Sequence, residues 1–94
     1  ANADQQLQRE ETAMSILDTA KQAAQLAQVR QGVAQSLENW QFARVTWIVA
    51  LDRLAQVADE TLASREAERL AAFYQSSLDE VDVRVRREKG AATS

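Results

Sequence analysis

The sequence predicts an all-α fold, a three-helix bundle or an elongated helical hairpin that associates into a larger helical bundle. The 94 residues contain no Pro and only two glycines, Gly32 and Gly90, so little in the chain interrupts a helix. Apolar residues recur at spacings of three and four, which is the period of an amphipathic helix. Many of them are Ala, which favours helix but buries little surface, so a single domain of this size gains stability from a partner.

The first helix is predicted over residues 4–31. Its apolar positions are Leu7, Ala13, Met14, Ile16, Leu17, Ala20, Ala23, Ala24 and Ala27. Gln residues line the other face, and the small Ala side chains allow a neighbouring helix to approach closely. Arg30 in the last turn suits the helix dipole, and Gly32 is typical of the residue that follows a helix.

The second helix is predicted over residues 36–58, with Ser36 as its N-cap and Glu38 in its first turn. One apolar stripe contains Trp40, Ala43, Trp47, Leu51, Leu54 and Ala58, and another contains Phe42, Val45 and Val49. A helix with two apolar stripes lies in the middle of an assembly. We expect its apolar surface to exceed what two helices of the same chain can cover.

The third helix is predicted over residues 64–89, with Ser64 as its N-cap, because the apolar register shifts by about one residue near Asp59. A flexible tail, 90–94, is expected after Lys89, and the whole chain, 1–94, forms one helical domain. Two alternatives stay open at this point. One is a single continuous helix over 36–89, and the other is a buried strand at 45–49, which would have no strand to pair with.

The charge of the chain limits its partners. A formal net charge of −3 argues against binding to nucleic acid or to anionic membranes, so we expect no nucleic-acid partner. The apolar run at 45–51 is too short to span a bilayer. The absence of Cys leaves the compartment open. Because the sequence begins at Ala1 without Met, we expect that a leading segment has been removed or that the chain lies within a longer protein. Cytoplasmic and exported locations are both compatible with the sequence.

The residues that usually carry catalysis are missing. There is no His, so the commonest zinc ligand and the usual proton carrier near neutral pH are absent. Two isolated glycines cannot form a phosphate-binding loop. The adjacent carboxylates Glu10 and Glu11 diverge on a helix and are expected to be solvated. We therefore expect no catalytic residue, no metal site, no cofactor and no enzymatic activity.

Aromatic residues provide the candidate functional site. Large aromatic side chains are over-represented at the centres of protein interfaces. Phe42 and Phe73 fall off the main apolar stripes, which suggests interface anchors rather than core residues. The residues predicted to form an interface are Trp40, Phe42, Val45, Val49 and Phe73.

Two protein families resemble the chain in general character. Its length, its helices and Trp40 after the first break resemble the small helical-hairpin proteins exported by type VII secretion. That family has Trp-x-Gly where this chain has Trp40, Gln41 and Phe42, and its Tyr-x-x-x-acid signal is missed by one residue between Tyr74 and Asp79. The chain is also similar in composition to flagellar and type III secretion chaperones. No family is assigned on these features.

The leading hypothesis is a non-enzymatic helical interaction protein: an assembly subunit, an adaptor or a secretion-type chaperone. It would form a homo-oligomer or pack against a helical protein partner through the stripe of Phe42, Val45 and Val49. Surrounding charges would set its specificity. The alternative is a sensory or regulatory bundle in which Arg44 and Arg53 meet a small anion.

Overall fold

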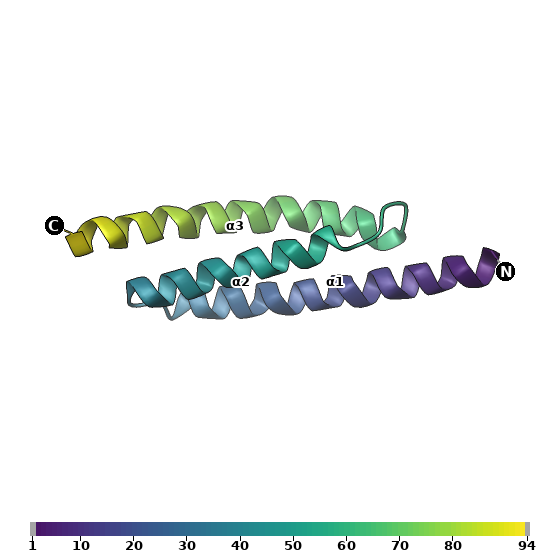
Figure 1. Ribbon diagram of the computed structural model, residues 1–94, viewed down its shortest axis with the longest axis horizontal. Helices are drawn as coiled ribbons and strands as arrows, with labels where there is room; N and C mark the ends of the chain where they lie inside the picture. The colour runs from purple at the N-terminus through teal and green to yellow at the C-terminus, as the bar shows by residue number, and fades with distance from the viewer. Residues whose placement is uncertain (1, 94) are drawn as a thin grey trace.

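Three helices make up most of residues 2–93, the part of the chain that the computed structural model describes. They are α1 (Asn2–Gly32), α2 (Leu37–Ala55) and α3 (Leu62–Thr93). The chain reverses direction twice, so α1 and α3 both run antiparallel to α2 (Figure 1). The prediction of an all-α fold with three helices is confirmed, and residues 45–49, the alternative strand, lie within α2.

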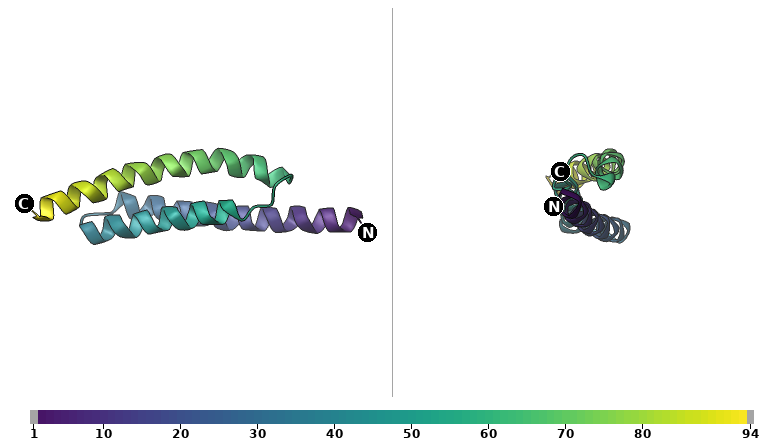
Figure 2. Two further views of the ribbon diagram at one scale, coloured as in Figure 1. Left: turned by 45° about the horizontal axis from the view of Figure 1, so that its top comes forward. Right: turned by 90° about the vertical axis from the view of Figure 1, so that its right-hand side faces the viewer.

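The three helices form a rod. α2 packs against both of its neighbours, whereas α1 and α3 contact each other much less. The molecule measures 63 × 17 × 15 Å, and α3 is bowed along its length (Figure 2). Because α1 and α3 are both longer than α2, the start of α1 and the end of α3 project at opposite ends of the rod (Figure 1).

The core lies along the two seams of α2. Trp47, Leu17 and Val81 are its largest fully buried side chains and come from three different helices. The indole N–H of Trp47 donates a hydrogen bond to Oε1 of Gln31 at 3.0 Å, and its ring centroid lies 5.5 Å from that of Tyr74. Trp47 therefore ties α2 to both α1 and α3, and its buried polar atom is satisfied.

Small side chains fill the seam between α1 and α2. The buried residues contributed by these helices include Ala13, Ala20, Ala24, Ala27, Ala43 and Ala50. A methyl group in place of a larger side chain lets two helix backbones approach closely, as the Ala-rich sequence predicts. The price is a thin core, because each Ala removes little apolar surface from water.

The start of α2 is capped as predicted. The backbone N–H of Asn39 donates to the Ser36 hydroxyl oxygen at 3.2 Å, and Ser36 has the extended backbone of an N-cap. Before this turn, α1 covers Asn2–Gly32, slightly more than the expected 4–31. Gly32 is the last helical residue, and its φ is not positive, so it does not form the left-handed cap that its position suggested.

The connection between α2 and α3 differs in its bounds from the prediction. α2 ends at Ala55 rather than near residue 58, because Val57 turns into the core and is 7% exposed. α3 begins at Leu62, so Ser64 is not its N-cap. Instead, the buried Thr61 accepts the backbone N–H of Ser64 on its hydroxyl oxygen at 3.2 Å. The break near residue 59 separates two helices, and a continuous helix over 36–89 does not form.

Contacts from α1 fix this connection in place. The Glu10 carboxylate accepts the backbone N–H of Leu62 at 2.9 Å, which satisfies one of the free N–H groups at the start of α3. The guanidinium of Arg9 donates to the carbonyl oxygen of Asp59 at 2.6 Å. Glu60 has a φ of 65°, a left-handed conformation that reverses the chain before α3.

The end of α3 lies beyond its predicted limit. The helix continues through Gly90 to Thr93, whereas a flexible tail was expected from residue 90. A single glycine costs a helix only about 1 kcal/mol relative to Ala, which does not stop a helix of this length. Ser94, the last residue of the expected tail, lies outside the described residues.

Candidate interaction surface

The central helix α2 is apolar on two faces. Its inner face is buried against α1 and α3 and contains Ala43, Trp47, Ala50 and Leu54. Its outer face carries Phe42, Val45 and Val49, which are 57%, 53% and 40% exposed. These three side chains, one helical turn apart, are called the apolar stripe below. The flanking helices leave a large part of each of the three exposed.

Phe42 of the apolar stripe contacts a cation from α1. The guanidinium carbon of Arg30, from the end of α1, lies 3.9 Å from the centroid of the Phe42 ring. The same guanidinium donates to the Thr46 hydroxyl oxygen at 3.0 Å, and that hydroxyl donates to the Phe42 carbonyl oxygen at 2.8 Å. The cation–π contact fixes one face of the ring while more than half of the residue stays in water.

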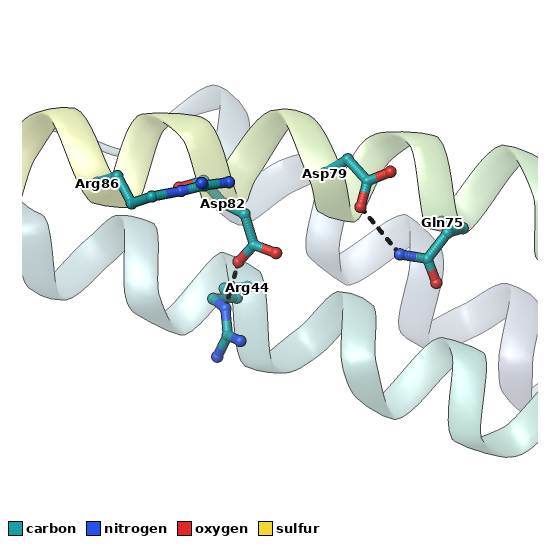
Figure 3. Close-up of polar contacts among 5 residues, drawn as sticks. All are labelled: Arg44, Gln75, Asp79, Asp82 and Arg86. Carbon is teal, nitrogen blue, oxygen red and sulfur yellow. Dashed lines mark hydrogen bonds and ion pairs between the residues drawn. The ribbon is translucent and has the colours of Figure 1, made fainter.

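A groove between α2 and α3 borders the apolar stripe. It has a volume of about 660 Å³ and is lined by Gln41, Arg44, Val45, Asp82, Val85, Arg86 and Lys89. Arg44 of α2 pairs with the Asp82 carboxylate of α3, and Nε of Arg86 donates to the Asp82 backbone carbonyl at 3.4 Å (Figure 3). Three cations face one carboxylate, so we name this feature the basic groove. Val45 belongs to both the apolar stripe and the basic groove.

Two of the predicted interface residues lie outside the apolar stripe. Trp40 is only partly exposed and packs against the core, with the guanidinium carbon of Arg84 at 5.1 Å from its ring centroid. Phe73 is 55% exposed and lies on α3, seven residues after Glu66 and therefore on the same helix face. Since Glu66 pairs with Lys21 of α1, that face is directed toward α1 and away from the apolar stripe.

The two arginines proposed to share an anion do not converge. Arg44 and Arg53 are nine residues apart on α2, which places them on opposite sides of the helix. Arg44 already contacts the Asp82 carboxylate, whereas Arg53 is exposed. One small anion cannot contact both side chains in this arrangement.

The only direct ion pair between α1 and α3 among the described residues joins Lys21 to Glu66. Nζ of Lys21 lies 2.8 Å from the Glu66 carboxylate. This contact raises the pKa of Lys21 and lowers the pKa of Glu66. Burial raises the pKa of the nearby Tyr74 phenol, with Lys21 opposing that change. Both side chains of the pair remain well hydrated, so the pair contributes little to stability.

A second exposed surface lies on α1, where the sequence pattern predicted buried residues. Leu7 and Met14 were assigned to the apolar face of the first helix, but they are 59% and 44% exposed. The buried face uses Ala13, Leu17 and later Ala residues instead. The signal that distinguishes the two faces is the charge beside the apolar residues, because Leu7 and Met14 are flanked by a line of carboxylates: Asp4, Glu11 and Asp18. These five residues form the acidic stripe.

The described residues lack two features that would point to another class of function. No helix within residues 2–93 combines the length and the apolar character needed to cross a membrane. Over the same residues, carboxylates do not gather in a group of three that could hold a metal ion. Comparison with known protein families, with curated proteins and with solved structures finds no match, so the functional assignment depends on the geometry of the surface alone.

Proposed function

We propose that the protein is a non-enzymatic helical interaction module that packs the apolar stripe against a helix of another chain. The observation that carries the proposal is the exposure of Phe42, Val45 and Val49 on the central helix of the described fold. Exposing three large apolar side chains one turn apart costs solubility, and such patches mark interaction surfaces in soluble proteins. An amphipathic helix fits an exposed ridge of this spacing.

The surroundings of the apolar stripe support this use. Phe42 is pre-positioned by Arg30, so little side-chain freedom is lost when a partner covers it. The basic groove adds charged groups at the rim, where they favour one partner and orientation over others. An assembly subunit, an adaptor and a secretion-type chaperone would all use such a surface.

The proposal is tested with the double variant Val45→Gln and Val49→Gln. Gln is a good helix former and both positions are exposed, so the variant is expected to fold like the original protein. Leu26→Gln with Val29→Gln is the matched control, because these two residues are also exposed and apolar but lie on α1. The original protein and both variants are immobilised and exposed to an extract of the source cells, and retained proteins are identified by mass spectrometry.

We expect a defined set of proteins, other copies of the chain included, to be retained by the original protein and by the α1 control. The same proteins should be lost with the α2 variant, whose helical content is checked by circular dichroism. Equal retention on all three proteins would show that the apolar stripe is not an interaction surface.

A further inference from the structure

The apolar stripe and the basic groove together define what can cover them. Val45 joins the two, and the buried Val85 of α3 also lines the groove. Arg86 and Lys89 stand on the far side of the groove, and no carboxylate of the described residues lies within salt-bridge distance of either. A helix that covers this surface needs apolar side chains on one line and carboxylates beside them.

The acidic stripe of α1 has this composition. Leu7 and Met14 lie two turns apart on one exposed line of α1, and the carboxylates Asp4, Glu11 and Asp18 lie on a second exposed line directly beside it. All five residues are exposed, and the first turns of α1 project past the end of α2 (Figure 1). The highly exposed Leu62 at the start of α3 lies beside them, in a hollow that it shares with Met14, Glu11 and Asp18.

We propose that a second copy of this chain docks its acidic stripe on the apolar stripe and basic groove of the first. Leu7 and Met14 would cover Val45 and its neighbours, while Glu11 and Asp18 meet Arg86 and Lys89. This inference depends on the proposed function, because it names the occupant of the same surface.

The position of the two surfaces requires a second molecule. Within one copy they lie toward opposite ends of a rod that is 63 Å long, so the acidic stripe cannot reach its own basic groove (Figure 1). The docked surfaces are different, so each copy offers one of each. A reciprocal contact closes a dimer, and a sequential contact builds a chain or ring of copies.

The experiment is a charge exchange on the purified protein. One variant carries Glu11→Lys and Asp18→Lys, and the other carries Arg86→Glu and Lys89→Glu. Sedimentation velocity over a range of concentrations measures the dissociation constant of self-association. We expect each variant alone to associate at least about tenfold more weakly than the original protein, because like charges then face each other across the contact. Association of the original protein should also weaken as salt rises.

Mixing the two variants gives the decisive measurement. Each retains one original surface, and the two reversed surfaces are again opposite in charge, so the mixture should recover association to near the original level. Glu68→Lys with Glu80→Lys and Arg65→Glu with Arg69→Glu are controls with the same changes in net charge. They alter exposed residues of α3 outside both surfaces and should leave association unchanged.

Three results would overturn this inference. They are a monomeric original protein at all concentrations and salt conditions, self-association that neither reversal weakens, and reversal effects that mixing fails to restore. The second result would point to contact between two apolar stripes. None of these results tests the proposed function. That is tested by the retention experiment with Val45→Gln and Val49→Gln, which does not depend on which chain is the partner.

Discussion

At the scale of single residues, the burial of Tyr74 between helices predicts how the stability of the protein changes at alkaline pH. The residue is 4% exposed and its ring lies 5.5 Å from the ring of Trp47. Burial raises the pKa of the phenol above its ordinary value of 10.0, so the folded state holds this proton more tightly than the unfolded state. The resulting stability is present below the ordinary pKa and is lost as pH rises through the folded value.

Tyr74→Phe keeps the ring and removes the titrating group. We expect the original protein and the variant to have similar melting temperatures at neutral pH. As the pH rises toward about 11, the melting temperature of the original protein should fall further than that of the variant. The variant still loses some stability, because the Glu66 contact raises the pKa of Lys21 and that contribution also disappears as Lys21 deprotonates. Thermal melts followed by circular dichroism at constant ionic strength measure this. Parallel pH profiles for the two proteins would contradict it.

At the scale of elements, the start of α3 depends on Thr61 rather than on Ser64. The Thr61 hydroxyl accepts the backbone N–H of Ser64 and donates to the carbonyl oxygen of Ala58 at 2.8 Å. Thr61→Ala should therefore lower the free energy of unfolding by about 1 kcal/mol, the usual cost of losing an N-cap. Ser64→Ala removes a hydroxyl that bonds within the first turn, and the better helix propensity of Ala offsets that loss.

Urea denaturation of both variants compares the two positions directly. If Ser64→Ala lowered the free energy of unfolding by as much as Thr61→Ala or more, Ser64 would be the cap, as the sequence indicated. The sequence pattern placed this cap three residues too late because Ser followed by Glu is a common start signal. Thr61 caps the helix because it is buried where the loop packs against α1. The local sequence does not show this packing.

The candidate site could be predicted only in part, because helical spacing shows which residues share one face of a helix but not how that helix packs against the others. Helical spacing alone separated Phe42, Val45 and Val49 from the stripe of Trp47, and these three residues are exposed. Spacing could not place Phe73 relative to them, since that depends on how α3 is rotated about its axis. It also assigned Leu7 and Met14 to the core, because it does not reveal that small Ala side chains form the buried face of α1.

At the scale of the whole molecule, the rod gives a measurable dimension. A compact domain of 94 residues has a radius of gyration of about 12 Å, whereas the Cα atoms of this structure give 16.3 Å. Small-angle X-ray scattering on the monomer should therefore give a value near or slightly above 16.3 Å, since bound water adds to it. The Val45→Gln and Val49→Gln variant is measured beside it, so that the proposed contact through the apolar stripe does not contribute. A value near that of a compact domain would mean that the three helices close into a short bundle.

The opposite placement of the projecting ends also determines how the molecule carries a mechanical load. The start of α1 and the end of α3 lie at the two ends of the long axis, and the antiparallel α2 connects these two helices (Figure 1). Tension between these points would draw α1 and α3 in opposite directions along α2, so both seams are loaded in shear. Many packed side chains must then slip together rather than one after another, so the rod resists extension along this axis more strongly than helices that peel apart in sequence.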